Sequence, residues 1–389
     1  MVTIKFILCL FFAHTAWCDT CNDSFSLAVG SYTNHAWFKP SKGKGVSIVD
    51  YVNGKLTTSR VLNTSITGDN PVYIAVWKPY LFIANSNIEQ GSVTRVFMSS
   101  DRKRIFTRAA SGSGLLTNHV SVVSPTVAMG TNFLSSFDTY LSKHGVLEVS
   151  DSFKVPLDLA SEVVANRSLG PMFGQPHPHM VLPYDDGVVV PDAGSDIVWH
   201  FRVNSTTGKL TKLKQIKMPL QDAPRHAAVH PSSKTVYVVG EESLTISVLR
   251  PEGCGDGLSL CSRIDVLEGK PDEVKLAAVR VTKDERFLYV SVRYPGTTNG
   301  LLAGYRLNPQ TGDIEAKLGM WNAFGVHPRD FYVIEKAGFE GRCVSFVAVV
   351  HRDSDNLVLI ERDRGSGMLR DYPALQHNIS SPTSVVPIW

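Results

Sequence analysis

A polar turn that recurs at regular intervals constrains the fold of this chain more than any other feature. The turn contains a glycine preceded by Asn, Thr or Ser, and its glycines are Gly54, Gly208, Gly312 and Gly367. Successive glycines are separated by 154, 104 and 55 residues, close to three, two and one copies of a unit of about 50 residues. Asn-Gly and Thr-Gly turns are typical of β-hairpins. The spacing therefore predicts a repeated unit built from β-strands.

Apolar runs recur with the same period. Runs rich in β-branched and aromatic residues, the composition of central strands in a sheet, start at Tyr80, Thr235, Arg286 and Val344. Another apolar run precedes each of them and a third follows, so each unit has room for four strands. No helical periodicity of useful length interrupts these runs, which argues against α/β folds.

The length of the chain indicates the number of units. Residues 19–389 amount to 371 residues, or 53 for each of seven units. We therefore expect an all-β, seven-bladed β-propeller with four-stranded blades. The last eight residues, from Pro382, resemble the first strand of a blade whose other strands lie near the N-terminus. Pairing of this C-terminal strand with the N-terminal blade would close the ring and leave no open sheet edge.

The third unit, from His119 to about Leu169, is the least regular, and residues 155–170 are expected to form a loop.

The first 18 residues have the pattern of a cleaved signal peptide. A basic residue precedes an apolar run that ends at Ala13, and small residues lie ahead of the polar Asp19. A membrane anchor would need about 20 apolar residues, whereas His14 interrupts this run. We therefore expect a signal peptide over residues 1–18, one propeller domain over residues 19–389, and a protein that is secreted or lies in the lumen of the secretory pathway.

Removal of residues 1–18 would leave four cysteines. Cys254 and Cys261 flank a Gly-rich hexapeptide, a spacing that suits a local disulfide in an oxidising compartment. Cys21 and Cys343 would then form a second disulfide that ties the first blade to the last, or Cys343 would be a buried free thiol. No Cys-x-x-Cys or paired His spacing accompanies the cysteines, so we expect no metal site.

Five Asn-x-Ser/Thr sequons are candidates for N-glycosylation. They begin at Asn22, Asn63, Asn166, Asn204 and Asn378. The formal net charge is only +3, from 39 basic and 36 acidic residues. A field this weak predicts neither a nucleic-acid nor a membrane partner, and the sequence carries no sign of an oligomeric state.

Polar residues at the starts and ends of the expected strands could converge on one central pocket. They are Gln175, His177, His179, Arg225, His226, Glu241, Arg293, His327, Arg329 and Asp330. Arginine, histidine and carboxylate together can hold an anion and move a proton. Each also has a structural alternative: the imidazoles of His177 and His179 could lie in a simple turn, and Arg225 and Arg329 could pair with carboxylates that join neighbouring blades.

Asp192 and Asp196 have the pattern of turn residues that bond the backbone. A metal site at His177 and His179 is disfavoured because no acidic ligand lies at a suitable spacing.

Seven segments, in this order and at blade intervals, carry a resemblance to a known family. They are QPHPH from Gln175, VPDAGSD from Val190, PRHAAVHP from Pro224, VYVVGEESLTISV from Val236, RFLYVSVR from Arg286, HPRDF from His327 and SDNLVLIERD from Ser354. The chain resembles the seven-bladed lactonase family, which includes propeller-type 6-phosphogluconolactonases and fungal 3-carboxy-cis,cis-muconate lactonizing enzymes. The resemblance extends from about Phe25 to the C-terminus.

The resemblance implies lactone chemistry without a cofactor in the central depression of the ring. His177, Arg225, Glu241 and Arg293 occupy the positions of the family's proposed active-site residues. We expect His177 and Glu241 to be catalytic. The expected substrate-binding residues are Arg225, Arg293, Gln175, His179 and Arg329.

The chain also departs from the family pattern. The family usually has Asn where this chain has Gly240 and Val292, and an Asn-Gln pair where it has Val350 and His351. These departures put the substrate, and activity itself, in question.

Together these features predict a secreted lactonase or lactonizing enzyme for a small anionic lactone of the sugar-acid or muconate type. The alternative is a catalytically inactive propeller that binds a ligand or a protein on its top face. A calcium-dependent gluconolactonase would need a cage of carboxylates and amides, which the sequence does not display.

Overall fold

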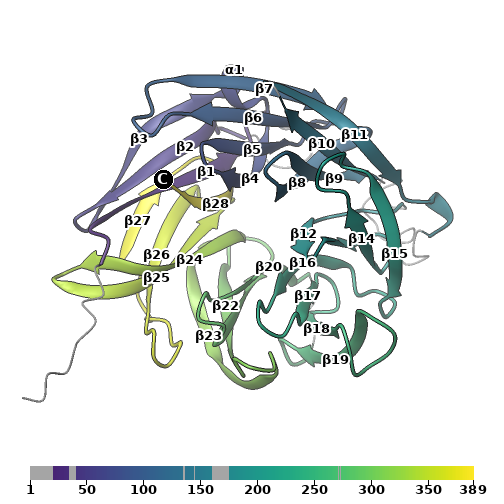
Figure 1. The fold of residues 1–389 in the computed structure, drawn as a ribbon. Coiled ribbons are helices and arrows are strands. Elements are labelled where there is room, and N and C mark those ends of the chain that lie inside the picture. Colours follow the sequence, from purple (N-terminus) through teal and green to yellow (C-terminus); the bar gives the residue numbers. More distant parts are fainter. Residues whose placement is uncertain are drawn as a thin grey trace, which may run out of the picture.

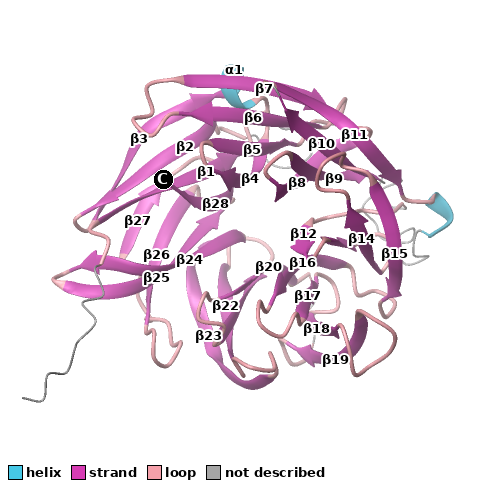
Figure 2. Cartoon of the chain, viewed as in Figure 1, coloured by secondary structure: helices cyan, strands magenta, loops and turns pink. Residues whose placement is uncertain are grey.

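Seven four-stranded antiparallel sheets are arranged around a common axis (Figure 1). The structure is a computed structural model that describes residues 21–34, 41–134, 136–143, 145–159, 175–269, 271 and 273–389. The predicted signal peptide and the sequon at Asn166 lie outside the described residues. The regular secondary structure of the described part is almost entirely strand (Figure 2), and none of its helices has the length and hydropathy needed to cross a membrane.

The four strands of each blade are ordered from the axis outward. Blade 1 has β28 (Pro382–Ile388), β1 (Ser24–Ser31), β2 (Gly45–Val52) and β3 (Lys55–Asn63). Blade 2 has β4 (Pro71–Trp77), β5 (Tyr80–Asn85), β6 (Ser92–Met98) and β7 (Ile105–Ser111). Blade 3 has β8 (Leu115–Ser124), β9 (Val127–Leu134), β10 (Ser136–Lys143) and β11 (Val146–Lys154). Blade 4 has β12 (Leu182–Tyr184), β13 (Gly187–Asp192), β14 (Ile197–Val203) and β15 (Leu210–Lys217).

Blade 5 has β16 (Pro224–Val229), β17 (Val236–Gly240), β18 (Thr245–Arg250) and β19 (Ser259–Asp265). Blade 6 has β20 (Lys275–Val281), β21 (Phe287–Arg293), β22 (Asn299–Leu307) and β23 (Ile314–Val326). Blade 7 has β24 (Pro328–Phe339), β25 (Arg342–His351), β26 (Asn356–Arg362) and β27 (Leu375–Asn378). A short helix, α1 (Thr64–Thr67), follows blade 1, and a 3-10 turn (Leu157–Leu159) follows blade 3.

Burial explains why the sequence shows continuous apolar runs. The second strands β17 and β21 are buried at every residue, because neighbouring blades cover both faces of each sheet. In the outermost strand β3, by contrast, only Leu62 is buried, and the other residues are exposed or partly buried. The core therefore lies between the blades, and the central strands of each blade must be apolar on both faces.

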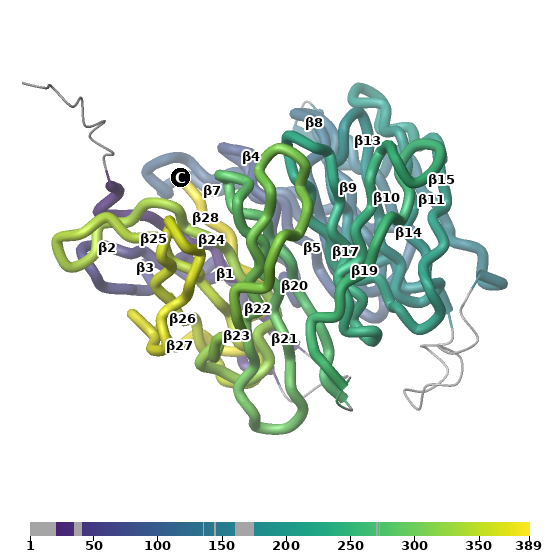
Figure 3. The backbone as a smooth tube through the Cα atoms, turned by 90° about the horizontal axis from the view of Figure 1, so that it is seen from below, coloured from purple at the N-terminus to yellow at the C-terminus, as the bar shows by residue number. Residues whose placement is uncertain are grey.

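The ring is closed as predicted, by the C-terminal strand. β28 pairs antiparallel with β1, with Val385 opposite Val29, so the first and last strands of the described chain lie side by side (Figures 1 and 3). A disulfide joins Cys21, just before β1, to Cys343 in β25 of blade 7. A second disulfide joins Cys254 to Cys261. Blades 1 and 7 are thus linked covalently as well as by packing, and Cys343 is not a free thiol.

The recurring turns connect the third and fourth strands and dock on the preceding blade. Gly312 and Gly367 have positive φ angles of 70° and 77°, which glycine adopts without steric cost. The carbonyl of Gly312 accepts a hydrogen bond from Tyr237 of blade 5, and that of Gly367 accepts one from Tyr289 of blade 6 at 2.5 Å. The repeat thus marks contacts between blades as well as hairpin turns.

The unit expected to be the least regular forms a complete blade, β8 to β11. Its apolar pattern is weak because buried polar pairs replace part of the apolar core: Asn132 Nδ2 donates to Asp138 Oδ2 at 2.6 Å, and both residues are fully buried. The expected loop begins with the 3-10 turn, and residues 160–170 lie outside the described residues.

Candidate functional site

Irregular pairing of the innermost strands brings polar side chains together near the axis. In blades 2, 3, 5, 6 and 7 the register of the innermost strand shifts close to its first residue. Such β-bulges change the direction of successive side chains and are common next to active sites. In β16 the shift spans Arg225 and His226, two neighbours that a regular strand would point to opposite faces.

Side chains from distant blades meet at this polar centre. Tyr73 on β4 of blade 2 accepts a hydrogen bond from Arg280 on β20 of blade 6, with Oη and Nη2 3.0 Å apart. Its ring also lies against His119 on β8 of blade 3, with ring centroids 3.8 Å apart. Blades 2 and 6 are not adjacent in the ring (Figure 1). The contact between Tyr73 and Arg280 therefore crosses the middle of the propeller.

An ion-pair cluster joins blades 5 and 6. Glu241, directly after β17, lies between Arg225 of β16 and Arg293 at the end of β21. Its Oε2 is 3.2 Å from Arg225 Nε and its Oε1 is 2.5 Å from Arg293 Nη2. The arginines also donate to the carbonyl oxygens of Ala277 and Leu276, both at 2.8 Å. The structure thus unites three of the residues predicted from the sequence and orients both guanidiniums through several bonds.

The charges in this cluster stabilise one another. Burial of Glu241 opposes ionisation, but the charges of Arg293, Arg225 and Lys275 outweigh it and hold the pKa of the carboxyl well below its usual range. Burial lowers the pKa of Arg225 to about 9, against the favourable charge of Glu241. At neutral pH Glu241 is therefore a carboxylate flanked by two cations, and it is not a proton donor.

His177 lies on blade 4, before β12, and is held by blade 3 and by its own blade. Its ring stacks on Phe133 of β9, with centroids 4.2 Å apart, and its Nδ1 is 2.6 Å from the Phe133 carbonyl oxygen. Its backbone N–H donates to Asp192 Oδ1 at 2.7 Å. A carbonyl can only accept a hydrogen bond, so Nδ1 carries the proton and Nε2 is the unprotonated nitrogen of the neutral ring.

Asp192 and Asp196 have the backbone-bonding roles expected of turn residues. Asp192 also accepts from the backbone N–H groups of Gly194 and Ser195, at 3.1 and 3.2 Å. Asp196 accepts from those of Gln221 and Ala223 in the loop before blade 5. Asp192 therefore fixes the segment that carries His177.

His179 lies closer to the charged cluster. Its ring contacts that of His226, with centroids 5.3 Å apart, and lies edge-on to Phe133. Burial, followed by the charge of Arg225, lowers the pKa of His179 well below its usual value, and the charge of Glu241 acts in the opposite direction. Phe133 thus bridges His177 and His179, and the charges of the cluster act on His179.

Blade 7 contributes Arg329 and Asp330 at the start of β24. Asp330 accepts a hydrogen bond from Arg280 of blade 6 at 2.8 Å, so a carboxylate does join neighbouring blades, through Arg280. Arg329 lies over the ring of Tyr32, 5.2 Å from its centroid. Among the described residues, Arg329 has no carboxylate within ion-pair distance. It is therefore the cation of this site that is best able to bind an anion.

Gln175 lies in the segment before β12 and is partly buried. Its backbone packs tightly on the turn that contains Asp192: a Cβ at Gly194 would lie 2.2 Å from the Gln175 carbonyl oxygen. This packing places Gln175 beside His177.

The departures from the family pattern have local structural causes. A Cβ at Gly240 would lie 2.1 Å from Ser243 Oγ and 2.7 Å from Asp222 Oδ1, so no side chain fits there. Val292 and Val350 are fully buried in the core, and His351 bonds Asn356 Oδ1 through Nδ1 at 2.8 Å. The space of a family Asn at position 240 is thus filled by the Asp222–Ser243 pair.

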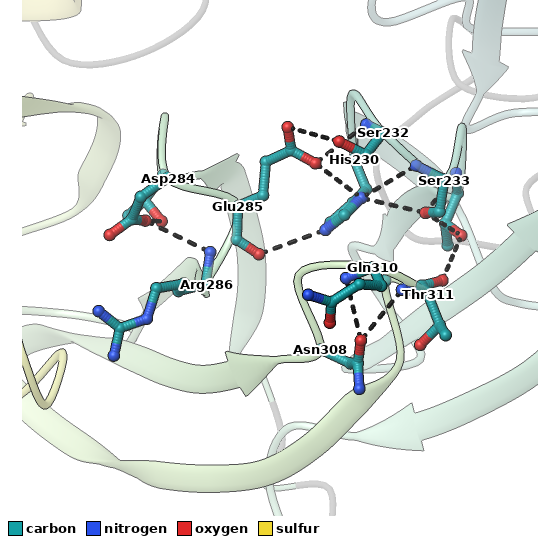
Figure 4. Close-up of polar contacts among 12 residues, drawn as sticks. His230, Ser232, Ser233, Asp284, Glu285, Arg286, Asn308, Gln310 and Thr311 are labelled. Atoms are coloured by element: carbon teal, nitrogen blue, oxygen red, sulfur yellow. Dashed lines mark hydrogen bonds and ion pairs between the residues drawn. The ribbon is translucent and has the colours of Figure 1, made fainter.

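A second polar cluster, away from the predicted site, contains serine, histidine and glutamate (Figure 4). Ser233 Oγ and Glu285 Oε2 lie 3.0 and 3.1 Å from the same atom, His230 Nδ1. His230 Nε2 lies 3.3 Å from the Glu285 carbonyl oxygen. A catalytic triad needs the serine and the carboxylate on different nitrogens. This cluster therefore joins blades 5 and 6 structurally.

Tyr73, His119 and Arg280 are further members of the site that the sequence pattern did not indicate. Each is a polar residue within the apolar run of an innermost strand. A polar residue that interrupts the apolar run of an inner strand is the sequence signal that could have identified them. In the part of the chain that the structure describes, no group of three or more His, Cys, Asp or Glu side chains is arranged to hold a metal ion.

Comparison with known proteins agrees with this architecture. A family model described as "Lactonase, 7-bladed beta-propeller" matches residues 26–387. The chain is 28% identical over 206 residues to a 6-phosphogluconolactonase of Bacillus subtilis, a match that covers 51% of this chain and 54% of that protein. The match thus spans about half the length of that relative.

Two solved structures share the fold. A putative 6-phosphogluconolactonase from Bacteroides fragilis superposes with a TM-score of 0.78 at 17% identity, over 94% of this chain and 98% of that one. The periplasmic gluconolactonase PpgL of Pseudomonas aeruginosa superposes with a TM-score of 0.76 at 21% identity, over 94% and 99%.

Proposed function

The chain belongs to the seven-bladed β-propeller lactonase family, and we propose that it acts, without a cofactor, on a small anionic lactone of the sugar-acid or muconate type. The observation that carries this proposal is the cluster of Arg225, Glu241 and Arg293, whose charges act on the imidazole of His179 on blade 4. Paired guanidiniums suit a carboxylate, a phosphate or a developing oxyanion.

His177 is the proposed general base of lactone hydrolysis. In this reaction a water oxygen adds to the lactone carbonyl, the ring C–O bond breaks, and the released alkoxide takes a proton to give the hydroxy acid. His177 Nε2 would take the proton from water and return it to the leaving oxygen. The hydrogen bond from Nδ1 to the Phe133 carbonyl supports this role because, in the neutral ring, it makes Nε2 the nitrogen that can accept a proton.

The arginines are proposed to bind charge. Arg225 and Arg293, together with Arg329, would bind the carboxylate or phosphate of the substrate. The contacts of Glu241 support a role in positioning both guanidiniums, in addition to the catalytic role expected from the sequence. Gln175 and His179 would complete the substrate-binding residues.

A panel of lactones tests the proposal. Turnover of glucono-1,5-lactone, its 6-phosphate and a muconolactone should be measured with and without a chelator, for the wild type and for His177→Phe. We expect turnover of at least one anionic lactone, no effect of the chelator, and a large loss in the variant. Equal rates for the wild type and the variant on every lactone would contradict the proposal.

One observation favours a second function, in which the propeller binds a ligand without turning it over. The family's usual Asn cannot fit at Gly240, and Val292 is buried in the core. If these differences have abolished catalysis, the lactones or their open acids should bind with no hydrolysis of any lactone in the panel.

We also propose that the protein is secreted and N-glycosylated. The two disulfides support folding in an oxidising compartment. The four sequon asparagines within the described residues are all exposed: Asn22, Asn63, Asn204 and Asn378.

A further inference from the structure

Three imidazoles from three blades meet beside the charged cluster. The ring of His226 on blade 5 lies 5.8 Å from that of His119 on blade 3 and 5.3 Å from that of His179 on blade 4, measured between centroids. Tyr73 packs on His119 from blade 2. The three histidines are only 1%, 7% and 4% exposed for His119, His179 and His226. We call these three residues the histidine row.

Each ring of the histidine row has a buried nitrogen that lacks a hydrogen-bond partner among the described residues. These atoms are His119 Nε2, His179 Nδ1 and His226 Nδ1. In His119 the other nitrogen, Nδ1, accepts a hydrogen bond from the Val181 N–H at 3.3 Å. The proton of its neutral ring is therefore on Nε2, and this buried N–H has no acceptor.

Unpaired buried polar atoms are rare in folded proteins because each one destabilises the folded state. Three of them in one place, contributed by three separate blades, indicate a site that a polar ligand completes. Water could serve as this ligand, so an experiment must separate water from a solute.

The charge state of the row indicates which chemical groups it can bind. Burial, followed by the charges of nearby arginines, lowers the pKa of each imidazole well below its usual value: Arg280 and Arg225 act on His119, and Arg225 acts on His179 and His226. The rings are therefore neutral at physiological pH. A neutral imidazole has one donor and one acceptor, which matches a hydroxyl group.

We infer that His119, His179 and His226 form a hydroxyl-binding subsite that makes this site select polyhydroxylated ligands over apolar chains of the same length. The inference rests on the proposed function only in placing the substrate at this site. The arginines would bind the anionic end of the ligand, and the histidine row would bind its hydroxyl groups.

Two carboxylates of equal chain length test this inference by binding alone. Gluconate and hexanoate are both six-carbon monocarboxylates, and only gluconate carries hydroxyl groups on its chain. Isothermal titration of the full-length wild type should show gluconate binding about 10-fold or more tightly than hexanoate, as expected for two or three net hydrogen bonds. The preference should hold from pH 6 to pH 8, because the rings stay neutral over this range.

The variants His119→Phe and His226→Phe keep an aromatic ring and remove its nitrogens. In each, the affinity for gluconate should fall to that for hexanoate, while the affinity for hexanoate stays unchanged. Their melting temperatures should match or exceed that of the wild type, because a buried unpaired polar atom is lost. Using two variants keeps the test valid if one fails to fold. His200→Phe on β14, whose ring packs on Tyr184, is the matched control and should leave the preference intact.

The inference would be overturned if the wild type bound gluconate and hexanoate with equal affinity, or bound neither. It would also be overturned if both His119→Phe and His226→Phe kept the full preference for gluconate. In those cases water satisfies the ring nitrogens. Selective gluconate binding without hydrolysis of any lactone would support the subsite and contradict the proposed function, so the two failures are distinguishable.

Discussion

Arg280 on blade 6 donates a hydrogen bond to the carboxylate of Asp330 on blade 7, with Nη2 and Oδ1 2.8 Å apart. Asp330 is 1% exposed, and its second oxygen accepts a hydrogen bond from the Val385 N–H of β28 at 3.2 Å. Arg280 also reaches Tyr73 on blade 2. A single guanidinium thus links blades 2, 6 and 7 at the polar centre.

Substitution of Arg280 should destabilise the fold. Arg280→Met leaves the buried Asp330 carboxylate without its cation, and loss of one partner of a buried pair costs about 3–5 kcal/mol. Urea denaturation should show a loss of this size. Arg306→Met, which breaks the exposed pair with Glu315, is the control and should change stability by about 1 kcal/mol or less. Equal midpoints for the two variants would rule out this role of Arg280.

Asp192 should make stability depend on pH. Burial raises its pKa to about 6, above the ordinary value of 3.8, against the hydrogen bonds from His177 and Ser195. The folded state therefore favours the protonated carboxyl. Its contribution is greatest below pH 3.8 and is lost as the pH rises through 6, a change of about 3 kcal/mol.

Asp192→Asn removes this titration and keeps an oxygen that can accept the backbone hydrogen bonds. The stability of the variant relative to the wild type should therefore rise by up to about 3 kcal/mol between pH 4 and pH 7. Denaturant unfolding of both proteins across this range is the measurement. A difference that stays constant with pH would contradict the raised pKa.

His177→Phe should separate chemistry from packing. The new ring can still stack on Phe133, so the fold should survive, but no nitrogen remains to move a proton. Loss of a positioned acid–base group lowers turnover about 100- to 10,000-fold. The kcat on the best lactone should fall on this scale with little change in melting temperature. His377→Phe on the outer strand β27 is the control, and an unchanged kcat in His177→Phe would remove His177 from the chemistry.

Arg225→Lys and Glu241→Gln should differ in their kinetic effects. A lysine cannot reproduce the planar fork that bonds both Glu241 and the Ala277 carbonyl, so Arg225→Lys should mainly raise KM, by about 10-fold or more. Glu241→Gln removes the charge between two guanidiniums and should lower kcat. Arg202→Lys, at an exposed ion pair, should change neither constant. A KM effect in Glu241→Gln with an unchanged kcat would contradict this assignment.

The two disulfides should contribute unequally to stability. The bond from Cys21 to Cys343 spans 322 residues, and the bond from Cys254 to Cys261 spans 7. In the loop-closure description these correspond to about 6 and about 2 kcal/mol. The double variant Cys21→Ser/Cys343→Ser should therefore melt at a lower temperature than Cys254→Ser/Cys261→Ser. The reverse order would show that chain entropy does not govern these bonds.

The sequence by itself determined the architecture. The glycines at 208, 312 and 367 and the apolar runs between them are local features, and turn chemistry and strand composition act over a few residues. The C-terminal strand from Pro382 could be assigned to blade 1 because a closed ring leaves no unpaired edge. The Cys21–Cys343 disulfide then followed as one of two options.

Only the tertiary structure decided which polar side chains meet. Tyr73 and Arg280 are 207 residues apart, and each lies within an apolar inner strand, where the sequence pattern shows core. Register shifts at the starts of the inner strands and closure of the ring bring these side chains to the axis, and neither effect is encoded in a local pattern. The same holds for Glu241, whose position between Arg225 and Arg293 depends on how blades 5 and 6 pack together.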